Sequence, residues 1–228
     1  MSGAGVYRKR WAINVEYAVF GDIHGNVEAL DTVWHSLERS GLTDRVIFNT
    51  GDNVGYGPSP EASVRFLQAR PQIVTARGNY DKNVALFPER EDEYRKKWAR
   101  ERPEKYEALR RDSAAISEES RRWLQALPAE IEVSLQGVSL VLTHYSPGSK
   151  RGLGTWTTDA ELKEIAAGTT ARIIVCGHTH TPFVRSVGSI LWVNPGSLGR
   201  SLDGTFHYAV LTLNDEHEPR AELKSVRN

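Results

Sequence analysis

The sequence predicts an α/β protein of one domain, residues 1–228, and two features of its element order support this. In the first part of the chain, short apolar runs that end near glycine alternate with segments of helical periodicity, a pattern typical of parallel strands joined by helices. From residue 130 onward, apolar runs separated by short turns predominate, which suggests a second sheet packed on the first. The chain contains no internal repeat or low-complexity linker that would divide it.

The first part supplies three strands and two helices. The three predicted strands each run into a glycine-containing loop, and they cover residues 17–20, 45–48 and 73–74. Between the first two, apolar side chains recur on one helical face from Val27 to Leu37, and Gly41 follows as a C-terminal stop. The second helix is expected at residues 59–69.

The later part is rich in strands. The clearest candidates are apolar runs at residues 138–142, 173–175, 190–193 and 208–211. One helix lies among them, and its start is marked by Thr158 and Glu161, which have the spacing of a capping box.

Residues 82–128 form a charged helical insertion between these two parts. Arginine, lysine and glutamate dominate residues 88–112, and a further helix at residues 117–127 stops at Pro128. One interpretation is a solvated helical surface with interspersed charges. The other is a cap over the active site, whose arginines contact substrate phosphates.

The composition excludes several classes of protein. Lys+Arg and Asp+Glu both total 29, so net charge indicates neither a nucleic-acid partner nor a membrane partner. Cys176 is the only cysteine, which rules out an internal disulfide, and its apolar surroundings predict a buried thiol. No apolar run approaches the roughly 20 residues that span a bilayer, so we expect a cytoplasmic protein.

Five short motifs carry the residues that can bind metal ions. Each follows a predicted strand, where open α/β sheets place their ligand sites. Together they hold seven candidate ligands, namely Asp22, His24, Asp52, Asn79, His144, His178 and His180. Carboxylate, amide and imidazole ligands in this mixture suit divalent transition metals such as Mn, Fe or Zn.

Seven ligands exceed what one ion needs, so two ions are expected. In an extended chain, residues i and i+2 share a face, so Asp22 and His24 could bind one ion while His178 and His180 reach two neighbouring ions. Two dications about 4 Å apart repel by roughly 17 kcal/mol at an effective dielectric constant near 20. Asp22, Asp52 and a hydroxide would leave a net charge of about +1 on the cluster, which suits an anionic phosphate.

In this order, the motifs resemble the signature of the calcineurin-like metallophosphoesterase superfamily, and most closely its small bacterial and archaeal phosphodiesterase-like members. The similarity extends from Asp22 to the turn at residues 194–197. It implies a four-layer αββα sandwich, with two mixed β-sheets flanked by helices. It also implies two metal sites that share Asp52, one completed by Asp22, His24 and His180 and the other by Asn79, His144 and His178.

The same resemblance implies a phosphoesterase that acts by in-line attack of a metal-bridging hydroxide on phosphorus. The candidate catalytic residues are then Asp52, Asn79, Tyr80 and His144. The expected substrate is a small phosphate ester or a nucleotide, and the sequence predicts no particular oligomeric state.

Tyr80 departs from the family pattern, which often has a histidine there that is thought to protonate the leaving oxygen. A phenol with a reference pKa near 10 is a poorer acid at neutral pH, which favours phosphodiesters with good leaving groups. The alternatives are a protein Ser/Thr phosphatase or a dinucleoside-polyphosphate hydrolase, both of which usually keep that histidine. A different class, a non-catalytic scaffold with this fold, is disfavoured because all seven ligands are present.

Other residues near the motifs have weaker cases. Asp81 is expected to cap a helix or to orient Tyr80 rather than bind metal, and Tyr145 to form a pocket wall or to stack on substrate. Arg77 could contact a phosphate or lie on the surface. The remaining histidines are not expected to be ligands, and these are His35, His207 and His217.

Overall fold

The computed structural model describes residues 14–201, 203–214 and 216–227, and in them ten strands form two five-stranded sheets. The first sheet has the order β10-β9-β1-β2-β3. Its strands are β1 (Val15–Phe20), β2 (Ile47–Asn49), β3 (Ile73–Thr75), β9 (Phe206–Leu213) and β10 (Pro219–Val226). The three short N-terminal strands pair in parallel, with Val19 opposite Phe48, and β9 joins β1 antiparallel.

The second sheet has the order β4-β5-β6-β8-β7. Its strands are β4 (Glu130–Leu135), β5 (Val138–Thr143), β6 (Ile173–Val175), β7 (Phe183–Val187) and β8 (Ile190–Asn194). The central three are parallel, and an antiparallel strand lies at each edge. Both sheets are therefore mixed.

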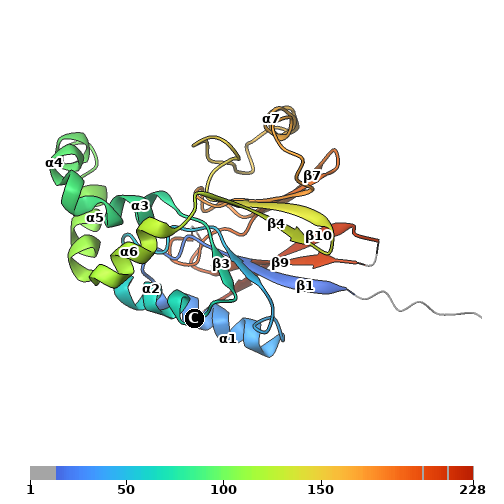
Figure 1. The fold of residues 1–228 in the computed structure, drawn as a ribbon, viewed down its shortest axis with the longest axis horizontal. Helices are drawn as coiled ribbons and strands as arrows, with labels where there is room; N and C mark the ends of the chain where they lie inside the picture. Colours follow the sequence, from blue (N-terminus) through green and yellow to red (C-terminus); the bar gives the residue numbers. More distant parts are fainter. Residues whose placement is uncertain (1–13, 202, 215, 228) are drawn as a thin grey trace, which may run out of the picture.

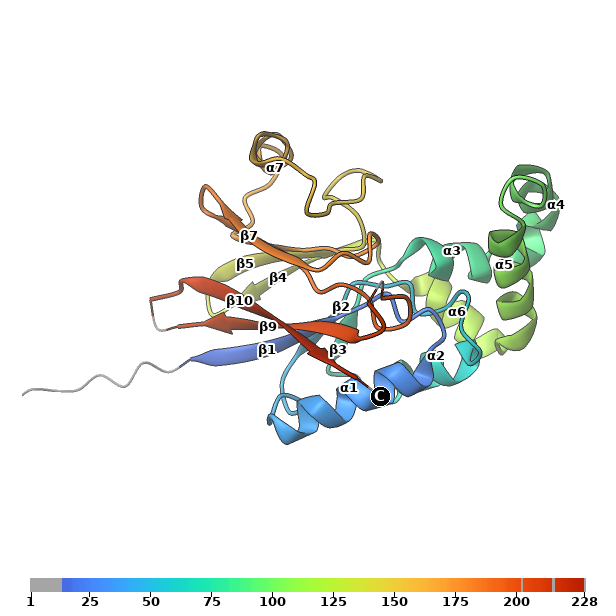
Figure 2. The ribbon, with the colours of Figure 1, turned by 180° about the vertical axis from the view of Figure 1, so that it is seen from behind.

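Helices cover the outer faces of the two sheets, as Figures 1 and 2 show. Helices α1 (Val27–Arg39) and α2 (Pro60–Gln68) flank the first sheet, and α7 (Asp159–Ala166) flanks the second. The inner faces bury one shared apolar core, to which Phe48 and Leu211 contribute from the first sheet and Leu142 and Val193 from the second. The expected four-layer sandwich is confirmed.

Local signals set the helix ends. The Asn26 side chain accepts a hydrogen bond from the Ala29 N–H at 3.0 Å and caps α1, and Gly41, with φ of +66°, follows the end of that helix. Thr158 and Glu161 form the capping box of α7, because the Thr158 N–H donates to Glu161 at 2.8 Å and the Glu161 N–H donates back at 3.3 Å.

The charged insertion folds into helices that project from one end of the sandwich (Figures 1 and 2). They are α3 (Asn79–Ala85), α4 (Phe87–Trp98), α5 (Pro103–Ala115) and α6 (Glu118–Ala126). Their charged faces are exposed, but a buried cluster that includes Phe87, Tyr106 and Leu124 holds them together. The carboxylate of Asp112 joins α5 to the loop after β2, because it accepts a hydrogen bond from the Gly55 N–H at 2.6 Å.

The polar C-terminal segment contains a strand that the sequence pattern did not reveal. β10 pairs with β9 along its whole length, although its residues are mostly polar. His217 lies in the turn that precedes it. As the edge strand of a sheet, β10 exposes alternate side chains. It therefore lacks a continuous apolar run that would mark it as a strand in the sequence. Among the residues that the structure describes, no helix is both long enough and apolar enough to cross a bilayer.

Candidate metal centre

The loops after β1, β2, β3, β5 and β6 converge at one end of the two sheets and bring the candidate ligands together. Among the described residues, two groups of possible metal-binding atoms form, and the atoms within each group lie within 4.8 Å of one another. The first group is Asp22, His24 and His180, and the second is Asp52, His144 and His178. Since the loops come from both sheets, their convergence depends on strand pairing within each sheet and on the packing of the two sheets.

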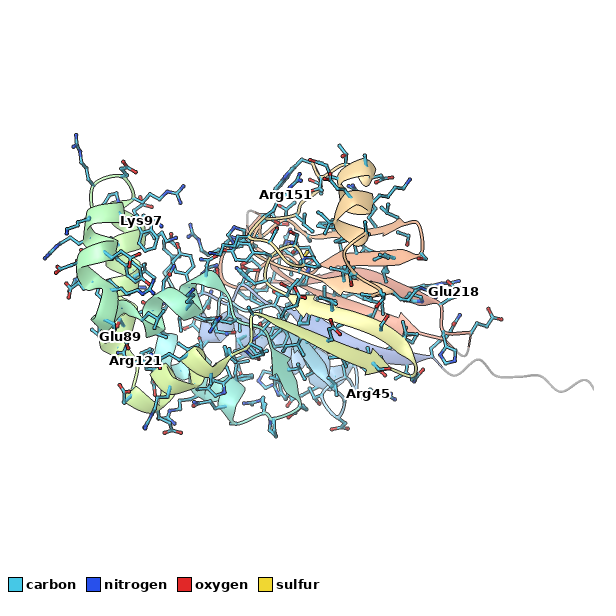
Figure 3. All side chains as sticks on the ribbon, turned by 45° about the horizontal axis from the view of Figure 1, so that its top comes forward. Arg45, Glu89, Lys97, Arg121, Arg151 and Glu218 are labelled. Atoms are coloured by element: carbon cyan, nitrogen blue, oxygen red, sulfur yellow. The ribbon has the colours of Figure 1, made fainter. Side chains whose placement is uncertain are left out.

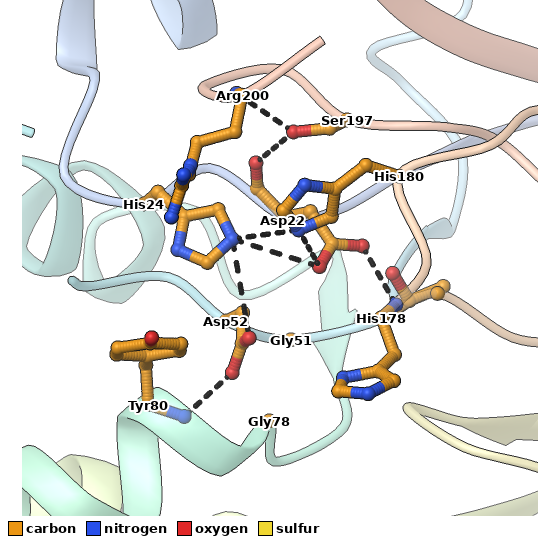
Figure 4. Close-up of polar contacts among 12 residues, drawn as sticks. Asp22, His24, Gly51, Asp52, Gly78, Tyr80, His178, His180, Ser197 and Arg200 are labelled. Atoms are coloured by element: carbon orange, nitrogen blue, oxygen red, sulfur yellow. Dashed lines mark hydrogen bonds and ion pairs between the residues drawn. The ribbon is translucent and has the colours of Figure 1, made fainter. Parts of the chain in front are cut away.

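In the first group, atoms that could bind a metal ion lack a suitable hydrogen-bond partner among the described residues. The Nε2 atoms of His24 and His180 face each other at 2.9 Å, and Asp22 Oδ1 lies 3.2 Å from His180 Nε2 (Figure 4). The same Asp22 Oδ1 atom is buried and accepts no hydrogen bond. Burying an unpaired carboxylate oxygen is costly, so a cation between these atoms would complete the group.

The second group is oriented by hydrogen bonds outside it. His144 Nδ1 lies 2.9 Å from the Thr50 carbonyl oxygen, to which it donates, and this contact turns Nε2 toward the group. That Nε2 atom lies 3.3 Å from Asp52 Oδ2 and 3.3 Å from Asn79 Oδ1. The Tyr145 hydroxyl donates to Asn79 Oδ1 at 2.8 Å and so fixes its direction.

Asp52 lies between the two groups. Its Oδ2 atom is 3.3 Å from His144 Nε2 in the second group and 3.9 Å from His24 Nε2 in the first. Its other oxygen accepts a hydrogen bond from the Tyr80 N–H at 2.7 Å. One carboxylate oxygen is therefore within reach of ions in both groups, as the two-ion expectation requires.

The backbone that carries these ligands is not extended, which corrects the premise that residues i and i+2 share a strand face. Five of the seven have left-handed φ angles, and they are Asp22 (50°), His24 (51°), Asp52 (54°), His178 (71°) and His180 (57°). Such conformations cost roughly 1–3 kcal/mol each in non-glycine residues and cluster at functional sites. Asp22 and His24 nevertheless lie in one group of donor atoms, whereas His178 and His180 lie in different groups.

Close backbone approach brings the loops together. The His24 N–H donates to the Asp52 carbonyl at 2.8 Å, which joins the loops after β1 and β2. A Cβ atom at Gly78 would lie 2.1 Å from Asp52 Oδ1 and 2.2 Å from the Asp52 nitrogen, so only glycine fits there. The carboxylate of Asp81 accepts hydrogen bonds from the N–H groups of Gly78, Asp52 and Asn53 at 2.8–2.9 Å. Asp81 therefore caps α3, as expected, and also fixes the loop of Asp52.

The turn at residues 194–197 supports the first group from behind. The Ser197 hydroxyl donates to the Asp22 carbonyl at 2.8 Å, and the Asn194 amide donates to the Gly177 carbonyl at 3.0 Å. This turn thus holds both the aspartate loop and the loop of His178 in place.

Burial and mutual charge shift the pKa values of these ligands. Burial lowers the pKa of His24 to about 4, although the carboxylates of Asp52 and Asp22 oppose the shift. Burial also disfavours charge on His144, but the nearby Asp52 carboxylate raises its pKa to about 9. Burial would raise the pKa of Asp52, yet His144 holds it well below its usual range. Near neutral pH, His24 is uncharged and Asp52 is ionised, which are the forms that bind metal, whereas His144 must release a proton when an ion binds.

The Tyr80 hydroxyl is hydrogen-bonded to a second tyrosine. It donates to the Tyr56 hydroxyl, and the Tyr80 ring packs on His24 with centroids 5.3 Å apart (Figure 4). The Arg200 guanidinium lies 3.8 Å from the centroid of Tyr56. The sequence analysis missed Tyr56 and Arg200. A signal for Tyr56 existed in its flanking glycines, since it adopts φ of +75°.

The other residues behave as the sequence suggested. His35 is exposed on α1 beside Glu38, and His207 hydrogen-bonds Asp203, so neither faces the two groups. The Cys176 thiol is fully buried, and burial raises its pKa to about 12.

Comparison with known proteins identifies the family. The profile of the calcineurin-like phosphoesterase superfamily domain matches residues 15–216. An uncharacterized protein of Methanocaldococcus jannaschii is 29% identical over 224 residues, which cover 92% of this chain and 86% of that protein.

Two solved structures share the fold at low sequence identity. One is a hypothetical protein of Pyrococcus horikoshii, with a TM-score of 0.78 and 18% identity, covering 93% of this chain and 88% of that one. The other is a metallophosphoesterase of Sphaerobacter thermophilus, with a TM-score of 0.70 and 19% identity, covering 94% and 89%.

The chain belongs to the calcineurin-like phosphoesterase superfamily, because the family profile spans most of its length. The family and the two groups of histidine and aspartate that could hold metal ions together indicate a metal-binding phosphate-ester hydrolase.

Proposed function

We propose that this protein is a dinuclear metal-dependent phosphoesterase that hydrolyses phosphodiesters of small molecules or nucleotides. The position of Asp52 Oδ2, 3.3 Å from His144 and 3.9 Å from His24, is the observation that carries the proposal. Asp22, His24 and His180 would hold one ion and Asn79, His144 and His178 the other, with Asp52 shared. Two divalent ions in these places, Mn, Fe or Zn, would lower the pKa of a bound water and neutralise phosphate charge.

The protein's own side chains orient the ligands and exclude water. Tyr145 and the Thr50 carbonyl fix Asn79 and His144 by the hydrogen bonds described above, so little reorganisation is needed when an ion binds. Asp22 and Asp52 are almost fully buried, which keeps the charges of their carboxylates unscreened.

The test is hydrolysis of bis-p-nitrophenyl phosphate by the full chain with Mn²⁺, Zn²⁺, Fe²⁺, Co²⁺ or Ni²⁺ added. Asp52→Asn should abolish metal-dependent hydrolysis, because it removes the shared negative charge. Asp31→Asn is the matched control, since Asp31 is an exposed aspartate on α1 and should retain wild-type activity. Absence of activity with every metal would contradict the proposal and favour a non-catalytic scaffold.

Tyr80 supports a preference for good leaving groups. Its hydroxyl proton is donated to Tyr56, so protonation of a leaving alkoxide is disfavoured compared with an imidazolium acid. We expect Tyr80→His to raise kcat/KM for alkyl phosphodiesters relative to aryl phosphodiesters. Tyr80→Phe is the control that removes the hydroxyl alone. Equal aryl and alkyl preference in wild type and Tyr80→His would contradict this part of the proposal.

A further inference from the structure

A cleft of about 880 Å³ lies between the helical insertion and the loop that follows β5. It opens onto the proposed metal centre, because Asn79, Tyr80 and His178 form part of its wall. In Figure 3, Lys97 on α4 stands on one side of this opening and Arg151, next to the lining residue Lys150, stands on the other. A volume in this range is typical of sites for small organic ligands.

The lining of the cleft is strongly basic. Five cations come from the insertion, and they are Lys82, Arg90, Lys97, Arg102 and Lys105. Arg77 and Lys150 add two more from outside it, whereas Glu93 and Glu130 are the only carboxylates that line it among the residues described by the structure. The whole chain has a formal net charge of zero, so this concentration of positive charge is local.

Most of these cations lack a carboxylate partner, whereas several arginines elsewhere on the same helices have one. Away from the cleft, Arg95 pairs with Asp92 and Arg110 with Glu107. Within the cleft, Arg90 alone has a carboxylate within 4.0 Å, at 3.7 Å, as far as residues 14–201, 203–214 and 216–227 are concerned.

Lys105 is the cation that joins the cleft to the proposed metal centre. Its Nζ atom lies 4.4 Å from the ring centroid of Trp98 and 5.1 Å from that of Tyr80. Burial lowers its pKa, and the charge of Asp52 opposes this shift. The ammonium group is half-buried against these two rings and has no carboxylate partner among the described residues, so it remains available to an anionic ligand.

We propose that this cleft binds the phosphate chain of a nucleoside polyphosphate, so that one phosphate reaches the metal centre and Lys97, Arg102 and Lys105 hold the others. The inference rests on the proposed function and extends its substrate class from phosphodiesters to nucleoside polyphosphates, whose phosphoanhydride bonds also have good leaving groups. A ligand with one phosphate would leave most of the seven cations unpaired, whereas a chain of three phosphates carries several negative charges and would pair with more of them.

An aromatic group on the ligand has two possible contacts in the cleft. The rings of Trp98 and Tyr145 are half-buried and form part of its wall. A base could stack on either ring, since aromatic faces bind every base. A long oligonucleotide fits less well, because the basic lining is confined to one cleft in a chain of zero net charge.

The test is calorimetric titration of the full chain, without added metal, with orthophosphate, inorganic tripolyphosphate and ATP. Tripolyphosphate should bind more tightly than orthophosphate, and ATP more tightly than tripolyphosphate. Combined Lys97→Ala, Arg102→Ala and Lys105→Ala should weaken tripolyphosphate binding at least about tenfold, since each removes a charge-assisted contact. Trp98→Ala or Tyr145→Ala should remove the advantage of ATP.

The matched control is a second triple variant, Arg95→Ala, Lys96→Ala and Arg110→Ala, which removes the same charge from α4 and α5 outside the cleft. It should keep wild-type affinity, and urea unfolding of both triple variants shows whether either has lost its fold. Equal weakening by the two triple variants would overturn the proposal.

Two further results would also overturn it. One is ATP binding no more tightly than tripolyphosphate, and the other is tighter binding of a short single-stranded oligonucleotide at the same salt concentration. Binding without metal separates this inference from the proposed function. Tripolyphosphate binding without any hydrolysis contradicts only the function, whereas hydrolysis of bis-p-nitrophenyl phosphate without tripolyphosphate binding contradicts only the inference.

Discussion

Gly78→Ala provides a direct test of the close packing around Asp52. Gly78 has φ of −79°, which alanine tolerates, so the effect would be steric rather than conformational. The added Cβ would lie 2.1 Å from Asp52 Oδ1 and 2.7 Å from Asp52 Cα, where ordinary contacts are 3.4–4 Å. The loop must therefore move by about 1 Å, and overpacking of this kind costs about 1–3 kcal/mol.

The same movement breaks a hydrogen bond. The Tyr80 N–H donates to Asp52 Oδ1 at 2.7 Å, and a bond to a charged acceptor contributes about 1.5–3 kcal/mol. The sum predicts a loss of about 2.5–6 kcal/mol of unfolding free energy. A displacement of about 1 Å at a reacting group can lower kcat/KM about 100-fold.

Urea unfolding followed by circular dichroism measures the first quantity, and Mn²⁺-dependent hydrolysis of bis-p-nitrophenyl phosphate measures the second. Gly168→Ala is the matched control, because its Cβ would meet only the Ile165 carbonyl at an ordinary 3.6 Å. This control should be neutral or stabilising by about 0.4–1 kcal/mol. If Gly78→Ala behaved like Gly168→Ala in both assays, the packing argument would be refuted.

Three further predictions concern residues outside the metal groups. Asp112→Ala should lower stability by about 1–3 kcal/mol in urea unfolding, because it leaves the buried Gly55 N–H unpaired; an unchanged midpoint would contradict this. Cys176 should not react with Ellman's reagent at pH 8 in the native state, since burial raises its pKa to about 12 and its thiolate forms only when pH approaches that value; rapid native reaction would disprove it. Trp192→Ala should destabilise by about 3–5 kcal/mol, whereas Trp156→Ala should change stability by about 0.5 kcal/mol or less, because Trp192 is fully buried and Trp156 is 62% exposed; similar losses for both would contradict the burial argument.

The regular elements were predictable where one face of the element is uniformly buried. The helix from Val27 and the strand ending at Phe20 repeat apolar residues at a clear period, and both lie where the pattern placed them. β10 was missed because an edge strand buries alternate side chains only partly, and its polar residues resemble a tail. Its place in the sheet depends on pairing with β9, which local sequence does not encode.

The candidate ligands were predictable from residue type and from their position after strands. The extended-chain argument for Asp22 and His24 was wrong, because both adopt left-handed φ angles of 50° and 51°. Contacts with other loops impose these angles, such as the hydrogen bond from the His24 N–H to the Asp52 carbonyl. A rule based on spacing along one segment cannot anticipate such contacts.

The sequence by itself determined the chemistry available to this protein. It determined which side chains can bind metal, the order in which they occur, and that residue 80 is a tyrosine rather than a histidine. The tertiary structure alone decided the distances, because strand pairing within each sheet and the packing of the two sheets place Asp52 between His24 and His144. It also decided that cations of the insertion, such as Lys105, line the cleft beside the candidate metal centre. The net charge of the whole chain is zero, whereas binding of an anion depends on where folding brings positive side chains together.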